Sequence, residues 1–175
     1  MKRFPNVFLR TGHGLAAVRP VAVTTVLGSC VAVTMSCPAR GIGLICHAFL
    51  PDSRETARGG RGFRPCRFVD TAVERMFESL ARLRVRPASL LIKVFGGADG
   101  PAANLGCGVG ASNLAAVERV LAGRGLRAAA RDVGGPFGRT IRFLTHTGQV
   151  FVKRIPLPDA DLPAPARTPF GGVAP

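Results

Sequence analysis

The feature that most constrains the fold is the step Gly28-Ser29-Cys30, which separates two runs of apolar and β-branched residues in TTVLGSCVAV. Runs of this kind are typical of buried strands. A glycine between them predicts a tight bend that presents the thiol of Cys30 to other groups. The thiol could serve as a nucleophile, as a metal ligand or as a small buried side chain, and the rest of the chain has to decide between these roles.

Most of the chain reads as strands. Strand-like runs are LAAVR, VAVTTVL, CVAVTM, IGLICHAFL, SLLIKVF, LRAAARDV, RTIRFLTH and the hairpin HTGQVFVKRI. Helical spacing predicts one helix over 68–84 and a second over 112–125, with Ser112 as the N-cap of the second. Because strands and helices do not alternate strictly, we predict an α+β layered sandwich rather than a doubly wound parallel fold.

Length and composition predict one domain. A chain of 175 residues with 47% hydrophobic residues can bury a core, and we assign residues 1–155 to it. Residues 156–175 are rich in proline, so we expect a disordered tail there. The chain shows no secretion signal and no apolar run of the ~20 residues that span a bilayer. We therefore expect a cytoplasmic protein without membrane insertion.

The formal net charge of +14 favours acidic partners. Only three of the 24 basic residues are lysines, and alanine, glycine and proline are abundant, as in chains from genomes rich in G and C. The charge alone is therefore weak evidence for nucleic-acid binding, and we expect no nucleic-acid partner. An arginine-rich loop at 51–67 is a candidate contact for an acidic protein surface.

The five cysteines do not follow a metal-binding or disulfide pattern. Their number is odd and no pair shows the C-x-x-C spacing of a zinc site. In a reducing compartment they should be free thiols. We therefore predict no metal site.

Cys30 has one promising partner in the sequence, which is His47. The two residues are 17 positions apart, with a turn at 37–41 between the runs that contain them. Strands joined by that turn would bring Cys30 beside His47, where an imidazolium could lower the pKa of the thiol. Thr24 and Thr25 are both candidates to orient the ring, and the backbone N–H groups of Gly28-Ser29-Cys30 could form an oxyanion hole.

At this point the chain resembles a known family. TTVLGSCVAV followed by GLICHAFLP, RFVDTAVERMFESL, LLIKVFGGA, VGASN, DVGGPFGRTIRF and TGQVFVKR is similar to the CheD family of chemoreceptor glutamine deamidases. The resemblance covers residues 15 to 155 in the same order. It implies a layered α/β/β sandwich with mixed β-sheets, similar to the catalytic domain of the cytotoxic necrotizing factor toxins.

The resemblance also implies a catalytic Cys-His-Thr set. On this sequence the set is Cys30, His47 and Thr24, where Thr24 lies six residues before the cysteine. The implied enzyme is a protein-glutamine glutaminase, a cysteine-dependent amidohydrolase of bacterial signalling. It hydrolyses glutamine side chains of methyl-accepting chemotaxis receptors to glutamate, without a cofactor.

Other readings of the same residues remain open. Some family members bind a CheC-type phosphatase, which is a possible partner here. A related thiol enzyme, such as a transglutaminase-like acyl transferase, would use the same residues. The alternative outside enzymes is a basic regulatory module that binds a phosphatase or nucleic acid without catalysis.

Overall fold

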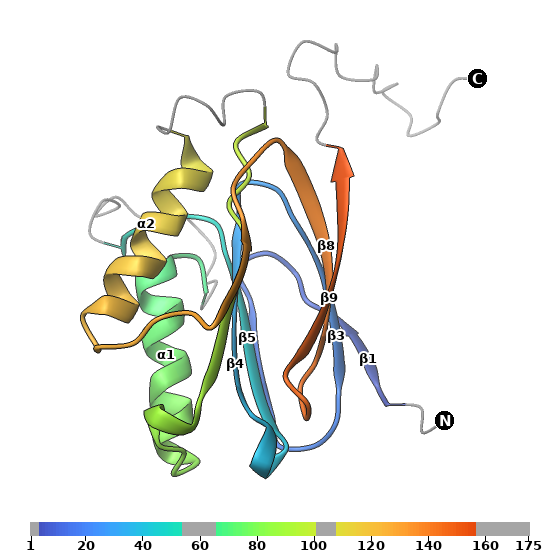
Figure 1. The fold of residues 1–175 in the computed structure, drawn as a ribbon, viewed down its shortest axis with the longest axis vertical. Helices are drawn as coiled ribbons and strands as arrows, with labels where there is room; N and C mark the ends of the chain where they lie inside the picture. The colour runs from blue at the N-terminus through green and yellow to red at the C-terminus, as the bar shows by residue number, and fades with distance from the viewer. Residues whose placement is uncertain (1–3, 54–65, 101–107, 157–175) are drawn as a thin grey trace, which may run out of the picture.

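The computed structural model describes residues 4–53, 66–100 and 108–156. Within these ranges the chain forms nine strands and two α-helices (Figure 1). Most of the arginine-rich loop, Cys107 and all of the predicted tail except Pro156 lie outside the described residues. The elements are β1 (Asn6–Phe8), β2 (Gly14–Ala17), β3 (Ala22–Leu27), β4 (Val31–Cys37), β5 (Ile42–Ala48), α1 (Val69–Arg82), β6 (Leu91–Gly96), α2 (Val109–Ala122), β7 (Ala130–Val133), β8 (Phe137–Leu144) and β9 (Gln149–Pro156).

The strands form two mixed sheets. One sheet has four strands in the order β1-β3-β8-β9, and the other has five in the order β2-β5-β4-β6-β7. The pairs β1/β3 and β6/β7 are parallel, and every other neighbouring pair is antiparallel. The predicted α+β class with mixed sheets is therefore confirmed.

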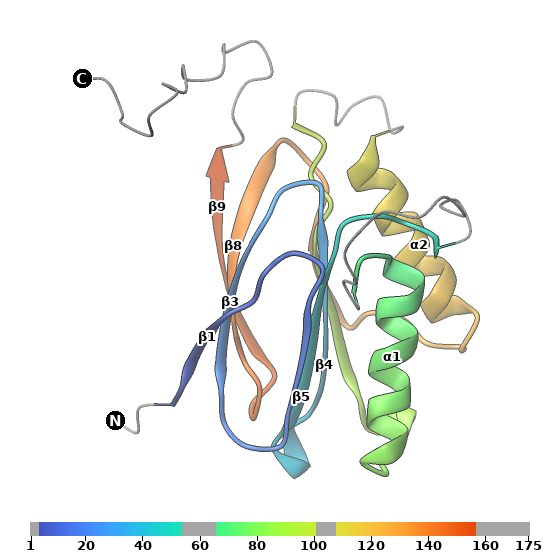
Figure 2. The same ribbon diagram turned by 180° about the vertical axis from the view of Figure 1, so that it is seen from behind.

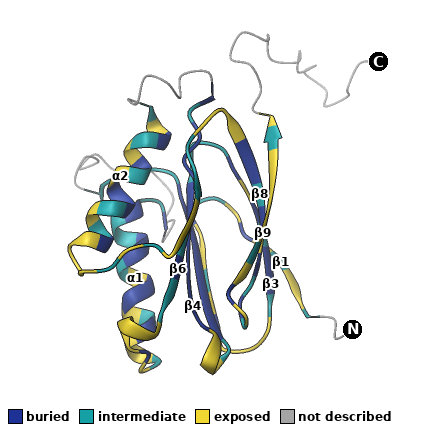
Figure 3. Ribbon diagram, viewed as in Figure 1, coloured by how far each residue is buried: buried dark blue, intermediate teal, exposed yellow. Residues whose placement is uncertain are grey.

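The elements stack in three layers, with the five-stranded sheet in the middle (Figures 1 and 2). Both helices cover one face of this sheet, and the four-stranded sheet covers the other. Strands β4 and β5 are buried along their whole length because both of their faces are covered (Figure 3). Two cores result: a helix-side core that includes Val33, Leu44 and Leu80, and an inter-sheet core that includes Ala32, Ile45 and Phe143.

The helix predicted over 68–84 is confirmed, but the predicted start of the second helix is wrong. Helix α1 buries the face that the apolar spacing indicated. Helix α2 begins three residues before Ser112, which is not its N-cap. The carboxylate of Asp99 instead accepts hydrogen bonds from the N–H groups of Gly110 and Ala111, at 2.7 and 2.9 Å. A cap supplied by another segment leaves no local signal at the helix start.

Strand β1 was not predicted, because three residues are too few to show a periodic pattern. The predicted hairpin is confirmed as β8 and β9, with Gly148 at its tip in a left-handed conformation, φ 73°. None of the helices in the described ranges is both long and apolar enough to cross a membrane.

Candidate active site

Cys30 lies where the chain crosses from one sheet to the other. Strand β3 belongs to the four-stranded sheet and β4 to the five-stranded sheet, and residues 28–30 are the whole connection between them. Cys30 is half-buried and packs against the inter-sheet core. The predicted bend is therefore confirmed, and it places the thiol at the edge of the layer between the sheets.

The carbonyl groups of Gly28, Ser29 and Cys30 all accept hydrogen bonds from other residues of the chain. The N–H of Ala98 donates to the Gly28 carbonyl at 2.9 Å, and the N–H of Gly97 donates to the Cys30 carbonyl at 2.8 Å. The Nδ2 of Asn113 donates to the Ser29 carbonyl at 3.0 Å. The described chain contains no cis peptide bond, so each N–H points away from the carbonyl of its own peptide unit.

The N–H of Ser29 therefore points away from Ala98, and the N–H of Cys30 points away from Asn113. Neither N–H has another residue as its hydrogen-bond partner within the described part of the chain. The N–H of Cys30 does lie close enough to its own thiol to favour the thiolate. N–H groups beside a nucleophile that have no other partner are the donors that an oxyanion hole requires.

His47 shares a face of the sheet with Cys30. In the β4/β5 ladder His47 pairs with Ala32, which belongs to the inter-sheet core and lies two residues after Cys30. Residues two apart on a strand point to the same side, and a diagonal neighbour across the ladder is within reach of a long side chain. His47 is 2% exposed, so its ring is almost wholly inside this layer.

A buried threonine holds the ring of His47. The Oγ1 of Thr25 lies 2.8 Å from the Nδ1 of His47 and also donates to the carbonyl of Leu9 at 2.8 Å. Because its only hydrogen goes to Leu9, the hydroxyl must accept from an Nδ1–H. The Nε2 of His47 then carries the lone pair, and the Oγ1 of Thr11 lies 3.4 Å from it. This tautomer is the one that a general base needs.

The expectation that Thr24 orients His47 is not met by the geometry. Successive strand residues point to opposite faces, and on β3 the alternate residues Val23, Thr25 and Leu27 are all buried, whereas Thr24 is half-buried and Val26 is exposed. Thr24 instead lies on the outer face of the four-stranded sheet, paired with Phe8 and Arg142. The residue analysis had left both threonines open, and the family resemblance selected the one whose side chain points away from the ring.

The pKa shifts of Cys30 and His47 indicate that both groups are uncharged at neutral pH. Burial, with a smaller contribution from the charge of His13, lowers the pKa of His47 to about 4. Burial also raises the pKa of the Cys30 thiol, and the thiol's contact with its own N–H only partly opposes this. The expected imidazolium that lowers the thiol pKa is therefore not present at neutral pH, because both groups have lost solvation of their charged forms.

The other described cysteines lie on the helix side of the five-stranded sheet. Cys37, Cys46 and Cys66 are buried in the helix-side core. Burial, followed by the neighbouring Cys66, raises the pKa of Cys46 to about 12. Cys46 directly precedes His47 on β5 and therefore points to the opposite face of the sheet. Cys37 was expected in a turn but is the last residue of β4.

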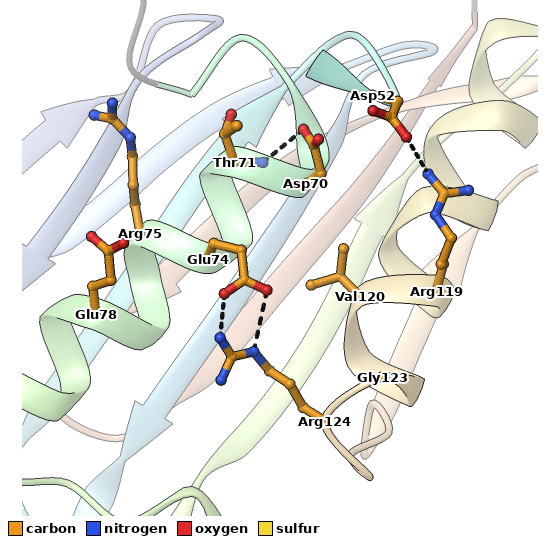
Figure 4. A pocket seen from close by; sticks show the side chains of 10 residues that line it. All are labelled: Asp52, Asp70, Thr71, Glu74, Arg75, Glu78, Arg119, Val120, Gly123 and Arg124. Atoms are coloured by element: carbon orange, nitrogen blue, oxygen red, sulfur yellow. Dashed lines mark hydrogen bonds and ion pairs between the residues drawn. The ribbon is translucent and has the colours of Figure 1, made fainter. Parts of the chain in front are cut away.

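A groove of 710 Å³ lies elsewhere, between α1 and α2 (Figure 4). Glu74 of α1 forms an ion pair there with Arg124, and Asp52 pairs with Arg119 of α2. The groove is on the outer face of the helix layer, whereas Cys30 and His47 face the four-stranded sheet. It is not part of the candidate active site.

Sequence reasoning missed Asn113. Its signal was present, because Asn113 falls among the small and apolar residues that form the buried face of α2. A polar side chain on such a face needs hydrogen-bond partners inside the protein. Which partners it finds depends on the packing of α2 against the sheet, and no local pattern contains that information.

Comparisons with known proteins show the family to which this chain is similar. A family model described as "CheD chemotactic sensory transduction" matches residues 49–154. The chain is 42% identical over 158 residues to "Probable chemoreceptor glutamine deamidase CheD" of Maridesulfovibrio salexigens, covering 86% of this chain and 92% of that protein. It is 42% identical over 160 residues to "Probable chemoreceptor glutamine deamidase CheD 2" of Geobacter sulfurreducens, covering 91% and 96%.

A third relative matches over a shorter stretch of the chain. The chain is 36% identical over 135 residues to "Chemoreceptor glutamine deamidase CheD" of Thermotoga maritima, covering 77% of this chain and 82% of that protein. The match to the family model and the coverage of 82% or more of each of these relatives agree with the ordered motifs of the sequence. The chain belongs to the CheD family.

Proposed function

We propose that this protein hydrolyses glutamine side chains of chemoreceptors to glutamate, with Cys30 as nucleophile and His47 as acid and base. The observation that carries the proposal is the hydrogen bond from the Nδ1 of His47 to the Oγ1 of Thr25, at 2.8 Å. It holds the base in a single tautomer on the face of the sheet that also carries Cys30. The names of the CheD relatives supply the substrate class.

The reaction begins from a neutral thiol and a neutral imidazole. The Sγ of Cys30 attacks the Cδ of the glutamine side chain while its proton moves to the Nε2 of His47. The oxyanion that forms accepts hydrogen bonds from the N–H groups of Ser29 and Cys30. His47 then returns the proton to the amide nitrogen, the C–N bond breaks, and ammonia leaves a thioester on Cys30.

Hydrolysis of the thioester completes the cycle. Water gives a proton to the Nε2 of His47 and its oxygen attacks the thioester carbon. The tetrahedral intermediate expels the thiolate of Cys30, which takes the proton back from His47. The products are a glutamate side chain and the regenerated thiol. All steps use groups of this chain and water, so we propose a reaction without a cofactor.

Thr25 is the positioning residue of this mechanism in our proposal. Its hydroxyl can neither donate to His47 nor rotate freely, since its hydrogen is committed to Leu9. It therefore favours Nδ1–H on the neutral ring and stabilises the imidazolium that forms during attack. Thr24 has no part in this proposal.

We also propose the cellular setting. The protein acts in the cytoplasm, on the glutamines that a methyltransferase can modify once they are glutamates. A CheC-type phosphatase is the partner that the family suggests. The fold of three layers supports a likeness to the catalytic domain of the cytotoxic necrotizing factor toxins, which are also glutamine deamidases.

The test uses a cytoplasmic receptor fragment with glutamine at its methylation sites. Incubation with the purified protein, followed by peptide mass spectrometry, should reveal glutamine-to-glutamate conversion that Cys30→Ala and His47→Ala abolish. Cys46→Ala is the matched control, because its thiol lies on the other face of the sheet. Equal conversion by Cys30→Ala, or none by wild type on several receptors, would favour the regulatory module over the enzyme.

A further inference from the structure

Asn113 is an unusual residue for the layer in which it lies. The structure describes seven buried polar side chains. Five of them lie in strands of the two facing sheets, and a sixth, Thr145, directly follows β8: the five are Thr25, Thr34, Ser36, His47 and Arg139. Asn113 alone among the seven belongs to a helix, on the buried face of α2. It is 0% exposed. Burial of an amide costs free energy unless hydrogen bonds replace those to water, so its contacts need an explanation.

The contacts of Asn113 are with the two strand ends that carry the active site. Its Nδ2 donates to the carbonyl of Ser29 at 3.0 Å and to the carbonyl of Phe49 at 3.3 Å. Ser29 directly precedes Cys30, and Phe49 lies two residues after His47. The last ladder pair of β4 and β5 is Val31 with Ala48, so the amide bridges the chains immediately beyond the end of the ladder.

The residue type follows from these contacts. Two carbonyls require two donors from one place, and a neutral amide supplies both from a single nitrogen. A hydroxyl would supply one, and an ammonium or guanidinium group would bury a charge. The Oδ1 of Asn113 has no hydrogen-bond partner within the described residues. The protein therefore uses the donors of this side chain, although burial of its acceptor is unfavourable.

Asn113 approaches from the side of the sheet opposite to the reacting groups. Helix α2 packs on the helix side of the five-stranded sheet, whereas Cys30 and His47 lie on the inter-sheet side. The amide therefore acts on the backbone of Ser29. The peptide between Ser29 and Cys30 is trans, so drawing its carbonyl towards Asn113 turns the N–H of Cys30 to the inter-sheet side.

We propose that Asn113 is a positioning residue that aims the N–H of Cys30 at the oxyanion of the deamidation reaction. This inference rests on the proposed function and adds a residue to it. Asn113 touches neither the substrate nor the thiol. It holds the donor in place before the reaction, which is the condition under which such a donor lowers a barrier most effectively.

The expected effect is confined to the chemical step. Removal of an oxyanion donor costs roughly 10²–10³ in kcat, and a donor that remains but is poorly aimed should cost less, about 10–100-fold. Alkylation of Cys30 by iodoacetamide develops no oxyanion, so its rate should not depend on Asn113. A merely structural role would change both rates together.

The experiment compares Asn113→Asp and Asn113→Gln with wild type, in the full-length protein and with the receptor fragment described above. Asn113→Asp keeps the shape but replaces the donors by acceptors, whereas Asn113→Gln keeps the donors on a longer side chain. Thr34→Val is the matched control, because it removes a buried hydroxyl from β4 without touching residues 28–30. The readouts are kcat, KM, the alkylation rate of Cys30 and the thermal unfolding midpoint.

We expect kcat to fall about 10–100-fold in Asn113→Asp, with KM and the alkylation rate within about threefold of wild type. Asn113→Gln should recover part of the loss, and Thr34→Val should keep its kcat. Unchanged kcat in Asn113→Asp, or a parallel loss of alkylation, would overturn the inference while the deamidase stands. Wild type without any deamidation would instead refute the proposed function, and the inference with it.

Discussion

The two faces of the five-stranded sheet differ in chemistry, although both are buried. The helix-side core is built almost wholly from apolar side chains and from the thiols of Cys37, Cys46 and Cys66. The inter-sheet core is smaller and adjoins the buried Thr25 and His47. Strands β4 and β5 contribute to both cores, so a shift of one residue along either strand exchanges the two environments.

This difference explains why the thiols of Cys46 and Cys30 differ in their access to the imidazole. Cys46 precedes His47 on β5 but faces the helices, whereas Cys30, directly before β4, faces the same layer as the imidazole. Proximity in sequence is therefore a poor guide to a catalytic pair on a sheet. The alternation of side chains decides which groups meet.

The largest expected effect is the loss of the thiol on the inter-sheet face. Cys30→Ala should lower kcat for receptor deamidation roughly 10⁶-fold, as when the nucleophile of another covalent enzyme is removed. Cys46→Ala should keep kcat and lose about 1 kcal/mol of unfolding free energy, because it only removes a small buried side chain. Mass spectrometry of the receptor and urea unfolding measure the two effects. Equal losses of activity in Cys30→Ala and Cys46→Ala would contradict the assignment of the reaction to the inter-sheet face.

The second prediction compares neighbouring residues of β3 that point to opposite faces. Thr25→Val should lower kcat about 10²-fold, because the Nδ1–H of His47 loses its acceptor and the tautomer is no longer selected. Thr24→Val, on the outer face, should stay within about twofold of wild type. Steady-state kinetics on both variants measures the contrast. The reverse order would restore the assignment that the family resemblance implied.

The third prediction concerns stability at acid pH. The pKa of His47 is lowered to about 4, below the unfolded value, so protonation favours the unfolded chain. This contribution to stability is complete above the unfolded pKa and is lost as the pH falls towards 4. Between pH 7 and pH 4.5 wild type should lose about 2 kcal/mol of unfolding free energy that His47→Gln does not lose. Urea unfolding at both pH values measures these free energies. Equal losses in wild type and His47→Gln would contradict a neutral imidazole in the folded protein.

The smallest effect tests how closely the sheets approach. A Cβ on Gly43 of β5 would lie 2.6 Å from the Cα of Thr145, which directly follows β8 of the facing sheet. Gly43→Ala should therefore cost about 1–3 kcal/mol through overpacking. Gly41→Ala is a control for backbone strain alone, because Gly41 has φ 63° and open space around its Cα. Thermal unfolding compares the stability lost in the two variants. A smaller loss in Gly43→Ala than in Gly41→Ala would show that the sheets can move apart to accommodate the methyl group.

Much of this protein could be predicted from its residues. The apolar spacing over 68–84 predicts a helix, and Gly28-Ser29-Cys30 predicts a bend, since both depend on neighbours within a few positions. The ordered motifs predict the CheD family, and the comparisons agree. The candidates Cys30 and His47 were predicted from the turn between two strand-like runs, which is also a local feature.

Other features were decided only by the tertiary structure. The choice between Thr24 and Thr25 depends on which face of β3 meets the other sheet, and both residues look alike in the sequence. The neutral state of Cys30 and His47 follows from burial between the sheets, because desolvation requires the layers to be assembled. The same is true of Asn113, whose partners lie 84 and 64 positions away along the chain. Local patterns determine elements, whereas the packing of layers determines which polar groups meet and how they are charged.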